Sequence, residues 1–294
     1  MNDTLSENYF SDARSLRRNS EHNEPSRPRV CEALARIREF KGGRSDWPHI
    51  NRAQLVEALE DRVMDPNLID QAGQNVCGVV AMLRAWALDS PVDYVSLALD
   101  LYTRGTGQLK GGRLGAPRWV TPSSELKSEA PPGGMNPADW LLSASIRESL
   151  NTVFNYTAGE GLFRIKAYTT PGDVENEFRR FGYSRIRNKA SLVLSSHGYE
   201  SLMEASQLFL QGSRVIMLVN SRLVDGLDAG VVRYPDHWVA LTSAIVPVIG
   251  GGEPLLYQFS VWSWAVERSI PQLADRIALK KVIGHYFGFV AGRY

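Results

Sequence analysis

Gln71-Ala72-Gly73-Gln74-Asn75-Val76-Cys77-Gly78 runs directly into the apolar segment Val79 to Trp86, and this stretch decides how the chain is interpreted. The polar and glycine residues predict a loop and the apolar run predicts a helix, so Cys77 stands where a helix begins. Free backbone N–H groups and the positive end of the helix dipole favour a thiolate at that position, and the thiolate is the nucleophile. We therefore expect Cys77 to be a catalytic nucleophile.

Two further residues complete a possible site for acyl chemistry. Gln71 lies six residues before Cys77, and its side-chain amide would donate to the oxygen of a carbonyl under attack. His237 opens the apolar stretch Trp238-Val239-Ala240-Leu241, which predicts a buried strand, and its imidazole would serve as the acid and base. Taken singly, Cys77 is more readily interpreted as a small core residue and His237 as a satisfied structural residue. Their combination with Gln71 favours catalysis.

Several short blocks of sequence are shared with a known family. They have the form Pro-x-Leu-Ile-x-Gln, Cys-Gly, Ala-Asp-Trp, His-Trp-Val and Ser-Trp, and here they read Pro66-Asn67-Leu68-Ile69-Asp70-Gln71, Cys77-Gly78, Pro137-Ala138-Asp139-Trp140, His237-Trp238-Val239 and Ser263-Trp264. In this order the chain resembles the papain-like cysteine peptidases, and more closely a bacterial group of toxin domains and secretion-system effectors of the type VI kind. The resemblance runs from about residue 66 to the C-terminus and implies a helix behind the site for the block that contains Asp139.

The third catalytic position departs from that family pattern. Papain-like enzymes have an asparagine before Ser-Trp, and here Trp262 takes its place. If residues 255–262 form a strand, Gln258 and Ser260 share a face with Trp262 by the two-residue alternation. We expect one of them to accept the hydrogen bond of the second imidazole nitrogen, with Gln258 ranked first and Asp236 expected to point away.

Composition limits the class of protein. The 294 residues are 44% hydrophobic, and 33 basic and 32 acidic side chains leave a formal charge of +1, which gives no general attraction to nucleic acid or to anionic membranes. No apolar run reaches the length of a membrane span and no signal peptide is visible, so cytoplasmic synthesis is expected. Two cysteines make no disulfide framework, and no short-spaced Cys or His pairs predict a metal site. We expect no cofactor.

The order of elements predicts an α+β fold with a papain-like arrangement. Residues 1–28 are polar and predict a disordered tail, followed by one catalytic domain over 29–294. Within it, a helical lobe over about 29–160 would carry Cys77, and a lobe with an antiparallel sheet over about 161–294 would carry His237. The expected helices are 30–40, 51–63, 77–86, 91–105, 135–153, 171–182, 201–210 and 271–281. The segment 105–134 is expected to be a long loop, and 237–249 with 255–262 an antiparallel hairpin.

The resemblance implies a cysteine peptidase that acts as an antibacterial or host-directed effector and is exported by a dedicated secretion system. Its partners would be a protein substrate and a cognate immunity protein. The same Cys–His pair also suits a deamidase, a transglutaminase or acyltransferase, or a peptidoglycan amidase. A third reading keeps the papain scaffold as a binding module without turnover, because Trp262 replaces the expected asparagine.

Overall fold

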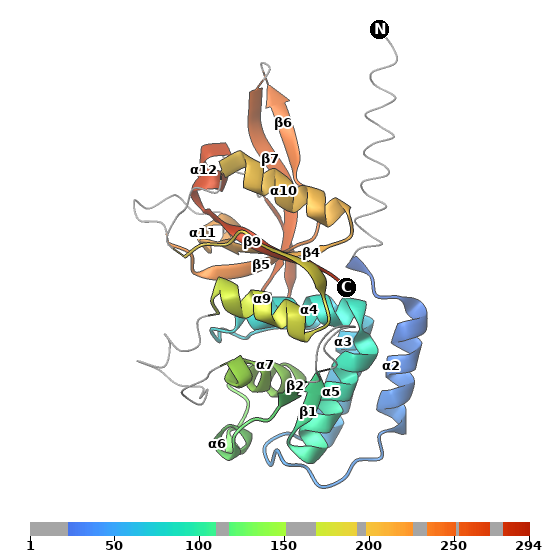
Figure 1. Ribbon diagram of the computed structural model, residues 1–294. Helices are drawn as coiled ribbons and strands as arrows, with labels where there is room; N and C mark the ends of the chain where they lie inside the picture. The colour runs from blue at the N-terminus through green and yellow to red at the C-terminus, as the bar shows by residue number, and fades with distance from the viewer. Residues whose placement is uncertain are drawn as a thin grey trace.

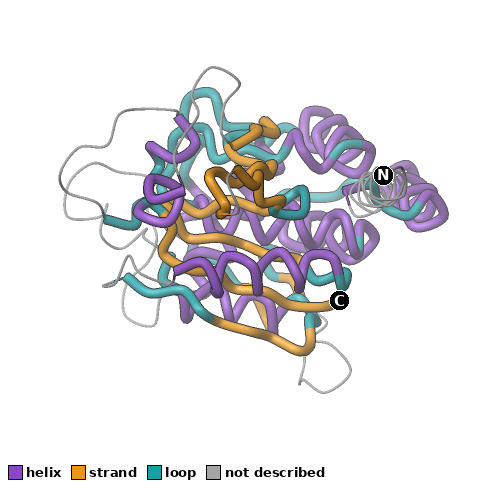
Figure 2. The backbone as a smooth tube through the Cα atoms, turned by 90° about the horizontal axis from the view of Figure 1, so that it is seen from above, coloured by secondary structure: helices purple, strands orange, loops and turns teal. Residues whose placement is uncertain are grey.

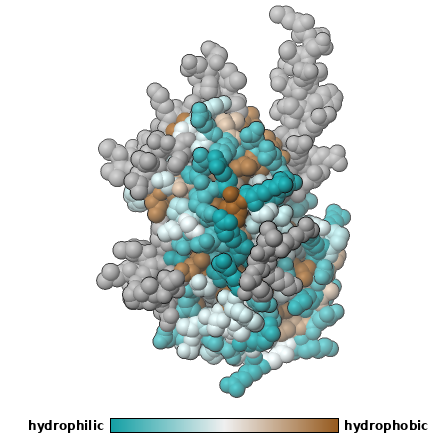
Figure 3. Space-filling model, in the orientation of Figure 1, coloured by the Kyte–Doolittle hydropathy of each residue, from teal (hydrophilic) through white to brown (hydrophobic). Residues whose placement is uncertain are grey.

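The computed structural model describes residues 23–109, 118–150, 169–192, 198–225, 234–250, 253–270 and 279–294. Its helices and strands segregate into a helical half and a sheet half, and the view in Figure 1 shows the sheet above most of the helices. This is an α+β architecture, as the sequence predicts. The face in Figure 3 is mostly hydrophilic with small apolar patches, so apolar side chains gather inside.

The helical half comes first in the chain. Its main helices are α2 (Arg27–Glu39), α3 (Arg52–Met64), α4 (Cys77–Asp89), α5 (Pro91–Arg104) and α7 (Pro137–Leu150), and the 3-10 turn η1 (Pro66–Leu68) follows α3. Local chemistry sets their ends: the Asn51 side chain accepts from the backbone N–H groups of Ala53 and Gln54 at the start of α3. At the other end of α5, Gly105 adopts a left-handed φ of 63° and closes the helix.

Helix α4 is the centre of the molecule. Every residue from Gly78 to Leu88 is buried, so the helix is enclosed on all sides. It packs against α5 and α7 in its own half and against α9 (Pro171–Arg180) and β5 (His237–Leu241) of the second half. The residue at its N-terminus is therefore brought to the boundary between the two halves.

The sheet half contains a seven-stranded antiparallel sheet whose strands lie side by side in the view from above (Figure 2). The order is β3-β9-β4-β5-β7-β6, and β8 pairs with β7. Its strands are β3 (Ser184–Asn188), β4 (Arg214–Val219), β5, β6 (Val246–Gly250), β7 (Glu253–Ser263), β8 (Val266–Ile270) and β9 (Tyr286–Arg293), and α10 (Gly198–Leu210), α11 (Arg222–Asp225) and α12 (Leu279–Gly284) accompany them.

Alternation along β5 separates two faces of the sheet. Trp238 and Ala240 belong to the large core shared with the helical half, together with Trp262 of β7. Val239 and Leu241 belong to a second core on the other face, which includes residues of α10, α11 and α12. In the register, Ala240 faces Trp262, so these two side chains lie on the helical side of the sheet.

Most predicted helices are present, with differences of a few residues at their ends. The expected loop over 105–134 is wrong, because its described parts hold the strands β1 (Gly107–Leu109) and β2 (Arg118–Val120) and helix α6 (Ser124–Ser128). The expected strand over 237–249 is two strands, β5 and β6, and only β6 forms the hairpin with β7. The expected helix over 271–281 is partly outside the described residues, where α12 begins at Leu279.

Of the tail predicted over residues 1–28, residues 1–22 lie outside the described part of the chain and residues 23–28 lie within it. Beyond that point Asn23 donates to the Thr242 carbonyl at 2.6 Å and helix α2 already begins at Arg27, so these last residues belong to the folded domain. Among the helices that the structure describes, none combines the length and the apolar character needed to cross a bilayer.

Candidate active site

Cys77 is the first residue of α4 and is half-buried beside β5. The backbone N–H groups of Trp238, Gly78 and Cys77 itself are directed at its sulfur and favour the thiolate. Burial acts more strongly in the opposite direction and raises the pKa of the Cys77 thiol from 9.0 to about 11. The helix terminus thus lowers the cost of ionisation, but it does not overcome desolvation.

His237 begins β5 and is 5% exposed. Its Nε2 lies 2.6 Å from the Oγ of Ser263, the last residue of β7. Burial, with a smaller contribution from the cation of Arg268, lowers the pKa of His237 to about 4. The imidazole is thus neutral at pH 7, and its Nδ1 is the ring nitrogen that Ser263 leaves for another partner.

The indole of Trp264 covers one face of this imidazole. The ring centroids are 4.4 Å apart and the planes are 15° from parallel, which is a stacked arrangement. Trp264 and Ala265 form the turn between β7 and β8, and both have positive φ values, 49° and 57°. Such a turn normally has glycine or asparagine, so the protein holds the indole over His237 at a local conformational cost of about 1 kcal/mol or more.

The prediction that Gln258 is the hydrogen-bond partner of His237 is wrong. Gln258 is exposed and lies opposite Val246 in the β6–β7 hairpin, whereas His237 is bonded to Ser263. The reason is the face of the strand: Trp262 points to the helical side, where its indole N–H donates to the Asn67 carbonyl at 3.0 Å. Residues that alternate with Trp262 therefore point away from His237, and the next residue, Ser263, points toward it.

Asp236 behaves as the sequence predicts and does not orient the imidazole. Its carboxylate accepts the backbone N–H of Ser221 at 2.6 Å and the Ser221 hydroxyl at 3.0 Å.

Cys77 lies beside the start of β5, the strand that begins at His237, because the backbone N–H of Trp238 is directed at its sulfur. Between these two described side chains the structure contains no hydrogen bond: the imidazole is bonded to Ser263. With a thiol pKa of about 11 and an imidazole pKa of about 4, both groups are neutral at pH 7. The resting pair is a thiol and an imidazole rather than an ion pair.

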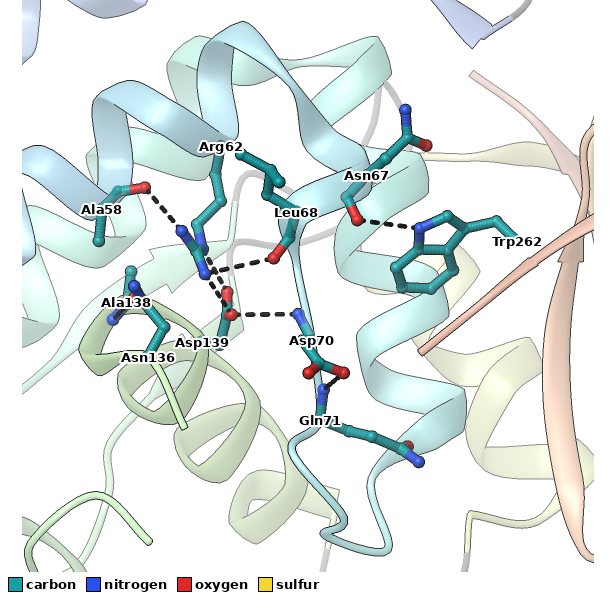
Figure 4. Close-up of polar contacts among 10 residues, drawn as sticks. All are labelled: Ala58, Arg62, Asn67, Leu68, Asp70, Gln71, Asn136, Ala138, Asp139 and Trp262. Atoms are coloured by element: carbon teal, nitrogen blue, oxygen red, sulfur yellow. Dashed lines mark hydrogen bonds and ion pairs between the residues drawn. The ribbon is translucent and has the colours of Figure 1, made fainter. Parts of the chain in front are cut away.

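Gln71 lies in the loop before α4 and is 8% exposed. Its side chain extends from the loop toward the helix that follows (Figure 4). Among the described residues its buried Oε1 has no hydrogen-bond partner. A turn with positive φ at Ala72 (45°) and Gly73 (77°) follows, closed by the Gln74 N–H donating to the Gln71 carbonyl at 2.9 Å. This turn reverses the chain so that Cys77 follows on the next helix.

Close packing fixes the first turn of α4. A Cβ atom on Gly78 would lie 2.6 Å from the Cγ2 of Thr169, so only glycine fits next to Cys77. Thr169 in turn accepts the indole N–H of Trp238 through its carbonyl at 2.8 Å. The glycine after the cysteine is therefore a packing requirement that holds Cys77 against the strand bearing His237.

Within the described parts of the chain, no cluster of three or more His, Cys, Asp or Glu residues has the geometry to hold a metal ion. Both cysteines are free, Cys31 on the surface and Cys77 at the site.

No protein-family model, no curated protein and no solved structure matches this chain.

Proposed function

We propose that this protein is a cysteine peptidase or closely related thiol hydrolase in which Cys77 attacks an amide carbonyl. The observation that carries the proposal is the meeting of Cys77, at the start of α4, with the strand that begins at His237. Acyl transfer requires an imidazole that can reach the nucleophile and a second group that orients the imidazole, and Ser263 would be that second group here.

The chemistry follows from the neutral resting pair. As the Cys77 sulfur forms a bond to the carbonyl carbon, its proton passes to His237, and the carbonyl electrons move onto oxygen. The backbone N–H of Cys77 and the side-chain amide of Gln71 would stabilise that oxyanion. Collapse of the intermediate breaks the carbon–nitrogen bond, and His237 returns the proton to the leaving amine. Water then attacks the thioester with His237 as base and releases the carboxylic acid and the thiol.

Proton transfer must accompany attack in this site, since a thiol pKa of about 11 and an imidazole pKa of about 4 leave few ion pairs at rest. Stabilisation of the oxyanion is then a large part of the catalytic effect. Removing one such donor typically costs about 2.7 to 4 kcal/mol of barrier, so Gln71→Ala should slow turnover strongly and Cys77→Ala should abolish it.

The proposed biological role is that of a secreted effector toxin with a protein substrate and a cognate immunity protein. Its support is the ordered set of sequence blocks around Gln71, Cys77, Asp139, His237 and Ser263-Trp264. An immunity protein would act by covering the site in the producing cell.

The test is expression of the wild type, Cys77→Ala and His237→Ala in bacterial cytosol, with growth measured and new protein N-termini labelled. Cys31→Ala is the matched control, because it removes the other free thiol, which lies on the surface. We expect toxicity and new N-termini with the wild type and Cys31→Ala only. Toxicity that depends on Cys77 without new N-termini would redirect the assignment to a deamidase, transferase or amidase. Equal growth of all four strains and unchanged proteomes would overturn the enzyme proposal.

One observation favours a second candidate, a binding module that keeps the fold without turnover. Cys77 has a raised pKa and shares no hydrogen bond with His237. A purified wild type that forms no acyl-enzyme with an activated ester, while retaining its fold, would support this candidate.

A further inference from the structure

A buried ion pair lies behind the Gln71 loop (Figure 4). Arg62 of α3 donates through Nε to Oδ1 of Asp139 at 2.8 Å and through Nη2 to Oδ2 at 2.7 Å. The side chains are 7% and 0% exposed. Breaking such a pair is costly, but an intact one adds little net stability because desolvation offsets the attraction. The effect of this pair on its surroundings is therefore more informative than its energy.

Both partners also hold the chain that leads to Gln71. Oδ2 of Asp139 accepts the backbone N–H of Asp70 at 3.0 Å. Nη2 of Arg62 donates to the Leu68 carbonyl at 3.2 Å. The Asp70 carboxylate then accepts the backbone N–H of Gln71 at 2.7 Å. A continuous series of hydrogen bonds thus runs from Asp139 through Asp70 to the backbone of Gln71.

The segment is also fixed at its other end, where the Asn67 carbonyl accepts the indole N–H of Trp262. The Gln71 amide oxygen has no partner among the described residues that would orient the side chain directly. No hydrogen bond through this oxygen to the described residues fixes the side chain, so the backbone from Leu68 to Gln71, which Asp139 and Arg62 hold, sets where the side chain begins.

We propose that Asp139, locked by Arg62, is a positioning residue that sets the Gln71 amide at the oxyanion site. This inference rests on the proposed function. An oxyanion donor acts only if it is in place before the charge develops, and a displacement of about 1 Å can reduce rates by up to about 100-fold. Asp139 accepts three hydrogen bonds with its two oxygens. Asparagine has one acceptor oxygen, so Asp139→Asn must release at least part of this set.

The test compares two reactions of the same sulfur. Acylation of Cys77 by p-nitrophenyl acetate forms a sulfur–carbon bond through a tetrahedral oxyanion and expels p-nitrophenolate, while the thiol proton leaves to base. Alkylation by iodoacetamide displaces iodide and develops no oxyanion. The ratio of the acylation rate to the alkylation rate therefore isolates oxyanion stabilisation from thiol ionisation and access.

We expect Gln71→Ala to lower this ratio by about 100-fold or more, and Asp139→Asn to lower it by about tenfold or more. The double variant should fall no further than Gln71→Ala, because Asp139 acts through Gln71. The matched control is Glu177→Gln, which breaks another buried ion pair, to Arg180, whose hydrogen bond among the described residues lies within α9 and not with the 66–71 segment. Its ratio should stay at the wild-type value.

If Asp139→Asn does not fold, Asp70→Ala tests the same series at its partly exposed last link and should also lower the ratio. A normal ratio in both variants, with a lowered ratio in Gln71→Ala, would overturn the positioning role and leave the proposed function intact. A normal ratio in Gln71→Ala would overturn the oxyanion role of Gln71 and this inference with it. Failure of the wild type to acylate at Cys77 would refute the proposed function itself.

Discussion

The raised thiol pKa of Cys77 predicts slow alkylation that keeps accelerating with pH. With a pKa of about 11, roughly one molecule in 10,000 carries a thiolate at pH 7. A free cysteine with a pKa of about 8.5 has about 3% thiolate at the same pH, roughly 300 times more. A more basic thiolate is more nucleophilic, which recovers about tenfold over this pKa difference. We expect Cys77 to react about 30-fold more slowly at pH 7 than the cysteine of a short unstructured peptide with a thiol pKa of about 8.5.

The assay is iodoacetamide alkylation in a Cys31→Ala background, followed by mass spectrometry of the peptide that contains Cys77. Restricted access to the sulfur would lower all rates equally, so the pH profile is the decisive measurement. The rate should rise about tenfold per pH unit from pH 7 to pH 10, while that of the reference peptide, with a thiol pKa of about 8.5, levels off above about pH 9. Circular dichroism at each pH confirms that the fold is retained. A plateau below pH 8 would show a resting thiolate and refute the argument that desolvation exceeds the effect of the three backbone N–H groups.

Three further outcomes are expected around the same site. Ser263→Ala leaves Nε2 of His237 without its buried partner, so it should lower the free energy of unfolding by about 1–3 kcal/mol and slow the acylation of Cys77. Urea unfolding measures the first effect and p-nitrophenolate release the second. Unchanged values for both would contradict the orienting role of Ser263. The lowered pKa of His237 means that the unfolded state binds more protons between about pH 6.5 and pH 4. The free energy of unfolding should therefore fall by about 3 kcal/mol as the pH is lowered from 6.5 to 4. Urea unfolding of wild type and His237→Gln at each pH should show this loss in the wild type only. Gly78→Ala places a methyl group against Thr169 and should destabilise by about 1–3 kcal/mol, and a wild-type midpoint in urea would show that α4 shifts without cost.

The local parts of the site were predictable from the sequence. The transition from the polar segment at Gln71 to the apolar run after Cys77 predicts a helix start, and α4 begins at Cys77. The stretch after His237 predicts a buried strand, and β5 begins at His237. Both signals come from residues next to one another in the chain, where periodicity and apolar content are informative.

The partner of His237 could not be predicted in the same way. Alternation identifies which residues share a face, but it does not say which face a neighbouring strand's histidine occupies. Taking Trp262 as the reference selected Gln258, whereas the register between β5 and β7 places Trp262 with Ala240 on the helical side. The turn at Trp264 and Ala265 could not be predicted from the sequence either, because neither residue is typical of a positive φ.

The ion pair behind Gln71 was out of reach for a different reason. Arg62 and Asp139 are 77 residues apart, and a charged residue on an amphipathic helix is ordinarily assigned to the solvent face. Only the packing of α3 against α7 shows that both are buried and directed at one another.

The two halves of the molecule contribute different parts of the proposed chemistry, and this explains why hydrogen bonds connect the two halves close to the site. The helical half holds Cys77 and Gln71, and the sheet half holds His237 with Ser263. A neutral thiol and a neutral imidazole have no attraction between ions to align them, so alignment has to come from the fold. The Trp262 indole bonded to the Asn67 carbonyl joins the sheet to the chain that leads to Gln71. Because proton transfer and oxyanion formation must occur together in such a pair, rigid placement of the oxyanion donor matters more than prior ionisation of the sulfur.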